Sequence, residues 1–531
     1  MKFSNQKIRI SLAGVLSVLV ALASGEFVAA IFSPRPGPVF AVANRVIDLA
    51  PTWFVDFGKT LFNLNDKPAL ILGTILITCL IGILIANLFL NNKSSGVIFI
   101  TVFGLISFFS IGVDAQAGWV FAFFISLFTG VVAFFALKAS LRLAAYENSE
   151  SDIAEEDIED EFVSELELTD RRRFIVMSAG ATFFALSASW TAKAVRALAS
   201  ISEYRATIFL RKPKDNSTEL EVADAVESSI NQTPGISPVV MPNDNFYKID
   251  TTTITPQVDP REWELKITGM VDKDLTYSYE DLLDRSITDV PVTLSCVSNP
   301  IGDSLVGNAV WQGVPLSELL DEAGVQVGAS QIASRSVDGW TCGFPTEVAF
   351  DGRNALVAVG MNGEPLPIDH GFPARLVVSG LYGYVSATKW LSEIFLTTWE
   401  GFDGFWMQEN RGWSKLGPVK TQSRIDTPFI GEKVTSGEEI VIAGVAWAPN
   451  TGITKVEVQT DLGDWVEADL GESLGKDSWL QWRTKWTPTE AGQKIIKVRA
   501  TDASGATQTS ESTPVRPDGA TGHHTIFIEA V

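Results

Sequence analysis

Four long apolar runs within the first 140 residues constrain the fold more than any other feature of the chain. They cover about 10–32, 68–90, 95–113 and 117–137, and each approaches the roughly 20 residues that a helix needs to cross a bilayer. A cleavable signal peptide would supply only one run of roughly 7–15 apolar residues. The sequence therefore predicts a transmembrane helical domain of four spans over residues 1–142.

Basic residues flank these runs on one side of the predicted membrane. They precede the first run, separate the second from the third, and follow the fourth (Lys2, Lys7, Arg9, Lys93, Lys138 and Arg142). Basic flanks favour the cytoplasmic side, so the N-terminus is expected in the cytoplasm, and four crossings return the chain there for an acidic, solvated linker over residues 143–170. Glu26, inside the first run, is expected near a helix end or facing a neighbouring helix, because an intramembrane charge is costly.

A group of arginines follows the linker and opens a fifth apolar segment over residues 171–195. Arg171-Arg172-Arg173-Phe174-Ile175 precedes a weaker apolar run to about Trp190. Two interpretations stay open: a twin-arginine export signal, although Asp170 precedes the pair and no Lys follows, or an ordinary fifth helix with a positive flank. Both predict a multi-pass protein of the cell membrane whose part beyond about residue 200 is extracytoplasmic.

Composition excludes several classes of partner and cofactor. The formal charge is −22, with 63 acidic and 41 basic residues, which opposes binding to nucleic acid phosphates. Three cysteines cannot build a disulfide framework. The histidines are His370, His523 and His524, and none lies in an apolar run, so no haem is expected. Electrons must then be exchanged with a separate redox carrier protein.

The pattern changes to short β-type runs from about Gly235, after a linker over residues 196–234. Strands are expected at 263–267 and 290–294, and short helices at 278–283 and 316–323, which predicts a mixed α+β domain over residues 235–415. In the last part of the sequence the patterns predict strands and no helices, with strands at 439–443, 453–460, 479–486 and 494–500. Strands separated by turn residues predict a β-sandwich over residues 416–531.

Cys296 ends one of the predicted strands, in Thr293-Leu294-Ser295-Cys296-Val297-Ser298-Asn299-Pro300. Strand pairing would hold its backbone while the following loop presents its side chain, as a fixed metal ligand requires. A lone cysteine is more often a buried, inert side chain. Spacing alone favours the inert alternative, and other features must decide.

Five segments in order supply those features: Met241–Tyr247, the segment around Cys296, Trp311–Leu316, His370–Leu376 and Tyr382–Trp390. Together they resemble the sulfite oxidase family of molybdopterin-dependent oxidoreductases over roughly residues 235–531, in a membrane-anchored bacterial form. The final strands, with Ala446-Trp447-Ala448-Pro449, look like the family's immunoglobulin-like dimerisation domain. The resemblance thus implies an α+β molybdopterin domain, a C-terminal immunoglobulin-like β-sandwich and a homodimer through that sandwich.

The resemblance also implies a molybdenum–molybdopterin cofactor, with Cys296 as the metal ligand and catalytic residue. A thiolate suits this role because it is a soft, charged ligand, and the anionic phosphate tail of the cofactor needs donors such as Arg375 and Lys389. Each residue taken alone has an ordinary explanation as a turn or ion-pair residue. The implied cofactor-binding residues are Asn245, Phe246, Tyr247, Cys296, Thr341, His370, Arg375, Ser386, Ala387, Thr388 and Lys389.

The chain departs from the family directly after Cys296. Sulfite oxidases carry an Arg close to the active cysteine, within a cationic pocket for sulfite, whereas Pro300, Ile301, Gly302 and Asp303 follow here. We therefore expect two-electron oxygen-atom transfer on a small substrate, with a neutral S-oxide or N-oxide favoured over a dianion. A sulfite oxidase proper, and a non-catalytic surface binding protein on a degenerate molybdopterin fold, remain the alternatives.

Overall fold

The computed structural model describes residues 2–32, 37–51, 54, 57–58, 61–62, 66–91, 93–113, 118–145, 201–211, 217–252 and 254–531. The chain forms two compact units. One contains the N-terminal helices with residues 251–257, and the other contains residues 202–250 and 258–531. The acidic linker beyond Ala145 and the arginine-rich segment over 171–195 lie outside the described residues, and the domain boundaries drawn from the sequence stay predictions.

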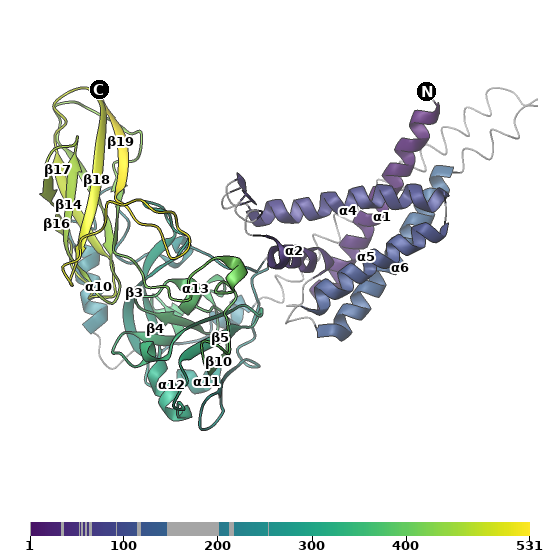
Figure 1. Ribbon diagram of the computed structural model, residues 1–531, viewed down its shortest axis with the longest axis horizontal. Helices are drawn as coiled ribbons and strands as arrows, with labels where there is room; N and C mark the ends of the chain where they lie inside the picture. The colour runs from purple at the N-terminus through teal and green to yellow at the C-terminus, as the bar shows by residue number, and fades with distance from the viewer. Residues whose placement is uncertain are drawn as a thin grey trace, which may run out of the picture. The chain divides into compact units, whose positions relative to one another are not determined.

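The first unit is built from long apolar helices (Figure 1). They are α1 (Lys2–Ile31), α4 (Asp66–Asn91), α5 (Lys93–Gly112) and α6 (Gly118–Ala145). Within the described ranges, three stretches are long and apolar enough to cross a membrane: Ile10–Ile31, Lys67–Phe89 and Gly118–Leu141. They coincide with the first, second and fourth predicted spans. The third predicted span falls in the helix α5, and its crossing of a membrane stays a prediction.

A further helix, α2 (Pro38–Leu49), follows α1 and was not predicted from the sequence. Pro38 begins it, where a proline costs no helical hydrogen bond. The backbone N–H of Val39 donates to Glu26 Oε1 at 2.9 Å, so a carboxylate from α1 lies at the positive end of α2. Glu26 therefore faces a neighbouring helix, as its cost inside a membrane led us to expect.

Two sheets organise the middle of the second unit, and short helices connect their strands. One sheet has the order β2 (Leu275–Ser278), β1 (Glu264–Gly269), β10 (Leu391–Thr397), β5 (Gln331–Ser336), β6 (Thr341–Pro345). The other has β3 (Thr288–Ser295), β4 (Val306–Pro315), β7 (Ala355–Met361), β8 (Glu364–Pro365), with β9 (Arg375–Val378) also paired to β7. The helical elements are α9 (Ser202–Arg205), α10 (Ser217–Glu227), α11 (Tyr279–Leu283), α12 (Leu316–Ala323), α13 (Gly383–Ser386), η2 (Asn243–Asn245), η3 (Thr346–Ala349), η4 (Ile368–His370) and η5 (Glu409–Arg411). The α+β prediction is confirmed.

The described C-terminal part contains strands in two further sheets. The first has the order β11 (Gln422–Thr427), β13 (Ile440–Trp447), β17 (Leu480–Trp486), β16 (Asp469–Leu470). The second has β12 (Lys433–Val434), β19 (His524–Ala530), β18 (Gly492–Asp502), β14 (Ile453–Thr460), β15 (Trp465–Glu467). Burial alternates along β18, as expected for a strand with one face turned to a core.

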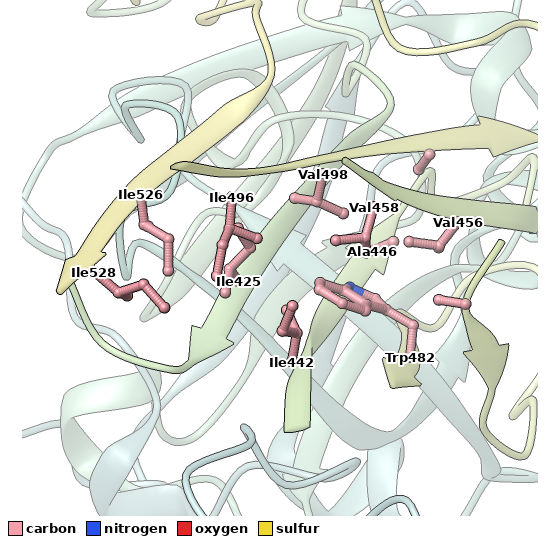
Figure 2. Packing of buried hydrophobic residues seen from close by; sticks show 12 residues of the cluster. Ile425, Ile442, Ala446, Val456, Val458, Trp482, Ile496, Val498, Ile526 and Ile528 are labelled. Carbon is pink, nitrogen blue, oxygen red and sulfur yellow. The ribbon is translucent and has the colours of Figure 1, made fainter. Parts of the chain in front are cut away.

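Side chains from both C-terminal sheets share one buried core (Figure 2). Ile442 and Trp482 come from one sheet, and Val458 and Ile496 come from the other. This packing confirms the β-rich C-terminus that the sequence predicts. Its immunoglobulin-like character stays a prediction.

Candidate functional site

Cys296 lies at the point where paired strands give way to a loop. Ser295 pairs with Val306 at the end of the β3–β4 ladder, and the next backbone N–H, that of Cys296, donates to the carbonyl of Leu305 at 2.9 Å. The side chain is 9% exposed, and its Sγ lies 3.0 Å from Ser298 Oγ. The backbone of Cys296 is thus fixed by its hydrogen bond next to the strand pair, and the residue keeps a small exposed fraction.

The loop after Cys296 is closed by its own side chains. Asn299, which is 2% exposed, donates from its backbone N–H to the Cys296 carbonyl at 3.1 Å. Its Oδ1 accepts from the N–H of Leu305 at 2.9 Å. An asparagine favours such loops because its amide can replace a missing backbone partner.

The C-terminal sheets hold the tip of the same loop. Gly302 has φ +83°, and a Cβ there would collide with the ring of His524, the first residue of β19. Arg424, on β11, donates from Nη1 to the Asp303 carbonyl at 2.9 Å and from Nε to Asp426 Oδ1 at 2.6 Å. The cysteine loop is therefore positioned by strands that lie far along the chain.

An aromatic cluster joins three of the segments that sequence reasoning singled out. Phe246, which is buried, stacks on Tyr247 with ring centroids 5.2 Å apart. It meets Trp311 and His370 edge to face at 5.6 and 5.5 Å. His370 Nε2 lies 3.0 Å from the carbonyl of Asn243, and burial lowers the pKa of the imidazole to about 4, so the ring is neutral at physiological pH.

Arg375 is a buried cation without an acidic partner in the described chain. It begins β9, is 5% exposed, and lies over the Trp311 ring at 4.9 Å. Its guanidinium donates to the carbonyls of His370 at 3.2 Å and Ala387 at 3.4 Å, and no described Asp or Glu lies within ion-pair distance. Burial lowers its pKa to about 10, so the group stays charged at neutral pH. An unpaired buried charge is costly, and an anion would offset that cost.

Lys389 is buried in the same region but is paired. Its Nζ lies 2.9 Å from Asp250 Oδ2 and 3.0 Å from the carbonyl of Asp369, and its side chain is 9% exposed. Gly371, with φ +110°, brings the turn after His370 close to both cations, because a Cβ there would lie 3.0 Å from Lys389 and 3.2 Å from Arg375. The two predicted cations therefore both donate to carbonyls of the chain just before this turn, Lys389 to Asp369 and Arg375 to His370.

Two predicted hydroxyl donors make contacts inside the protein. Ser386 Oγ donates to the Tyr382 carbonyl at 3.1 Å, and Thr388 Oγ1 lies 2.7 Å from Ser334 Oγ and 3.1 Å from Cys342 Sγ. Both residues are fully buried. Their role at a cofactor stays a prediction, as do those of Ala387, of exposed Asn245 and of Thr341, which begins β6.

Electrostatic coupling shows which side chains are close to the cysteine. Burial raises the pKa of Tyr247, with Cys296 raising it further and Arg375 lowering it. Burial also raises the pKa of Tyr382 to about 12, and the Cys296 charge acts in the same direction. Tyr247, Cys296 and Arg375 are therefore close enough to interact electrostatically, and their roles at a cofactor stay predictions.

Sequence reasoning missed Ser298 and Arg424. Ser298 stands two residues after Cys296 in the predicted loop, and this spacing was a signal. Arg424 had no local signal, because its contact with the loop depends on the packing of the C-terminal sheets. In the described part of the chain, no three His, Cys, Asp or Glu residues are arranged to hold a metal ion.

Comparisons with known proteins match part of this chain to oxidoreductases. The model of the oxidoreductase molybdopterin-binding domain matches residues 252–406. The uncharacterized oxidoreductase YuiH of Bacillus subtilis is 35% identical over 182 residues, which cover 34% of this chain and 87% of that protein. Human mitochondrial sulfite oxidase is 28% identical over 303 residues, covering 49% of this chain and 55% of the relative. The chain therefore spans about half the length of the sulfite oxidase that it matches.

One further curated protein and one solved structure are also similar to part of this chain. A spinach (Spinacia oleracea) NADH nitrate reductase is 27% identical over 313 residues, covering 48% of this chain and 34% of the relative. Among solved structures, the sulfane dehydrogenase SoxCD from Paracoccus pantotrophus is 22% identical, with a TM-score of 0.49 over 61% of this chain and 93% of that chain.

Proposed function

Because this chain belongs to the family of oxidoreductases that carry a molybdopterin-binding domain, we propose that it transfers an oxygen atom to or from a small neutral substrate at a molybdenum centre. The observation that carries the proposal is Arg375, a buried guanidinium with no acidic partner in the described chain. The phosphate of molybdopterin would supply the missing negative charge. Cys296 would supply the single protein ligand of the metal.

The residues present fit this cofactor in two respects. A thiolate is a soft ligand suited to a metal whose other ligands come with the pterin, and Cys296 is a single cysteine at a fixed strand end. A paired and an unpaired cation, Lys389 and Arg375, lie close to one turn. When bound, the molybdenum centre supplies the two-electron exchange that no side chain can perform.

The surrounding side chains would orient the substrate and exclude water. Tyr247 keeps its phenolic proton because burial raises its pKa, so it can donate a hydrogen bond to a substrate oxygen. His370 stays neutral, with Nε2 at the Asn243 carbonyl, and its ring packs on Phe246. These contacts hold the aromatic wall in one orientation.

A neutral substrate is favoured by the charges around the cysteine loop. Arg424 is the cation that contacts this loop, but Asp426 neutralises it at 2.6 Å. Asp303 adds a carboxylate to the loop itself. A dianion such as sulfite would meet little net positive charge there, whereas a sulfoxide or an N-oxide would not need it.

Sulfite oxidation is the second candidate, and Arg375 is the observation that favours it. Its unpaired charge could serve a dianionic substrate in place of the cofactor's phosphate. Electrostatic coupling of Tyr247 to both Arg375 and Cys296 supports a position for Arg375 close to the reacting centre. The two candidates therefore differ in which anion Arg375 binds.

We further propose that apolar helices anchor the enzyme in the cell membrane with its catalytic part outside the cytoplasm. Three helices long and apolar enough to cross a membrane support the anchor, and the flanking basic residues support the orientation. The chain's histidines all lie outside the apolar runs, which supports electron exchange with a separate carrier protein. A homodimer through the C-terminal sheets belongs to the same proposal.

A substrate comparison tests the proposal. Catalytic efficiency is measured on the detergent-solubilised protein, for sulfite with an oxidising dye and for a sulfoxide or an N-oxide with a reducing dye. The account predicts higher efficiency for the neutral oxides, and Cys296→Ser provides the background rate. Efficient sulfite oxidation without turnover of neutral oxides would favour the second candidate and would contradict the argument from the Arg424–Asp426 pair.

A further inference from the structure

The sulfur of Cys296 has a hydrogen-bonding partner of its own. Its Sγ lies 3.0 Å from Ser298 Oγ, two residues along the loop. Either atom can donate while the cysteine is a thiol. Once the sulfur is a thiolate ligand it carries no proton, so the Ser298 hydroxyl must be the donor.

The loop geometry holds this hydroxyl in place. Val297 and Asn299, on either side of Ser298, are 4% and 2% exposed. Asn299 is fixed at both ends by its bonds to the Cys296 carbonyl and the Leu305 N–H. The turn therefore holds the backbone of Ser298 beside Cys296, which keeps its hydroxyl within hydrogen-bonding reach of the sulfur.

The second buried cysteine shows that a sulfur–hydroxyl contact alone does not make a metal site. Cys342 Sγ lies 3.3 Å from Ser334 Oγ and 3.1 Å from Thr388 Oγ1. It is fully buried inside the sheet, and burial raises the pKa of its thiol to about 11. Cys296, by contrast, is 9% exposed at a strand end.

A hydrogen bond to a metal-bound sulfur withdraws electron density from it. The sulfur then donates less charge to the metal, which stabilises the reduced metal relative to the oxidised one. We propose that Ser298 is a positioning residue that holds the Cys296 thiolate and raises the reduction potential of the metal bound to it. This inference rests on the proposed function, because it requires molybdenum at Cys296.

Potentiometric titration of the full-length, metal-loaded protein tests the inference. The molybdenum signal is followed by electron paramagnetic resonance, and the thiolate-to-metal absorption band is recorded in parallel. Ser298→Ala should lower the potential and shift the absorption band while the molybdenum content stays at the wild-type level. Ser298→Thr, which keeps the hydroxyl, should restore both. Ser304→Ala is the matched control, because Ser304 lies in the same loop but its hydroxyl bonds the Asp303 carboxylate at 3.1 Å.

Each outcome tests either the proposed function or the role of Ser298. A wild-type protein without molybdenum would contradict the proposed function itself. Molybdenum in all variants, with the same potential in Ser298→Ala as in wild type, would overturn the role of Ser298 and leave the proposed function standing. If Ser298→Ala loses its metal, retention of the metal in Ser298→Thr supports the inference. Loss of the metal from both variants would show that the packing of the loop, and not the hydroxyl, controls metal binding, and this would overturn the inference.

Discussion

Cys296 and Cys342 carry the same side chain in contrasting surroundings, and burial separates them. Cys342, on β6, is fully buried beside the hydroxyls of Ser334 and Thr388, whereas Cys296 directly follows β3 and is 9% exposed. The sequence could place Cys296 at a strand end because the preceding residues alternate as a strand does. It could not show that no described Asp or Glu lies within ion-pair distance of Arg375, since that depends on which carboxylates the fold brings near. For the same reason, the sequence could not show that Ser386 and Thr388 form hydrogen bonds inside the protein.

Replacing the cysteine tests its role at the residue scale. Cys296→Ser should abolish activity and remove or alter the molybdenum signal while leaving the fold intact, because serine is nearly isosteric but its hydroxyl is a poor soft ligand. Metal analysis, electron paramagnetic resonance and circular dichroism of the purified variant measure the three effects.

The control for that variant is the same substitution at the other buried cysteine. Cys342→Ser should keep metal and activity, since Ser334 and Thr388 are placed to hydrogen-bond a new hydroxyl. Wild-type turnover by Cys296→Ser would rule out the thiolate assignment.

At the scale of elements, the C-terminal sheets act on the cysteine loop as well as on their own core. Arg424 of β11 and His524 of β19 contact Asp303 and Gly302 of that loop. The sequence predicted the short helices α11 and α12, because helix patterns and turn residues are local signals. It also predicted six of the nineteen described strands, namely β1, β3, β13, β14, β17 and β18. It could not predict the contact between β11 and the loop, which joins segments that are distant in the chain.

Removing the Arg424 side chain should destabilise the second unit more than removing an arginine elsewhere in the same sheets. The Arg424–Asp426 pair is nearly buried, with side chains 11% and 7% exposed, and breaking such a pair costs roughly 3–5 kcal/mol. Arg499→Ala is the matched control, because Arg499 pairs with Glu457 on β14 at 2.9 Å and is 28% exposed. That loss should cost about 1 kcal/mol or less.

Denaturant unfolding of both variants, followed by tryptophan fluorescence, measures the difference. Retention of molybdenum after dialysis shows whether the loop is loosened. Equal free energies of unfolding, with equal metal retention, would mean that Arg424 does not brace the loop.

At the scale of the whole molecule, the sequence predicted the apolar helices best. It predicted least well the direction in which each helix crosses the membrane. Three helices coincide with predicted spans, because a long apolar segment has few alternatives to a helix in lipid. The helix α2 escaped prediction because it has only 12 residues and depends on Glu26 for its N-terminal contact. Orientation rests on the flanking charges alone.

Topology is tested by fusing a reporter enzyme after residue 210. The flanking charges predict activity outside the cytoplasm. Replacing Arg171 and Arg172 by Lys then separates the two interpretations of the arginine-rich segment. Loss of export of the folded, metal-loaded protein indicates a twin-arginine signal, and unchanged export indicates an ordinary helix. A reporter active only in the cytoplasm would contradict the orientation.

Molybdenum content tests the central claim most directly. The full-length protein is purified from cells that make molybdopterin, and its metal and pterin are quantified against protein concentration. The account predicts about one molybdenum and about one molybdopterin per chain, because the thiolate of Cys296 would bind the metal and Arg375, which has no acidic partner in the described chain, would bind the phosphate. Protein that is folded but holds neither metal nor pterin would contradict it and would favour a non-catalytic binding protein built on this fold.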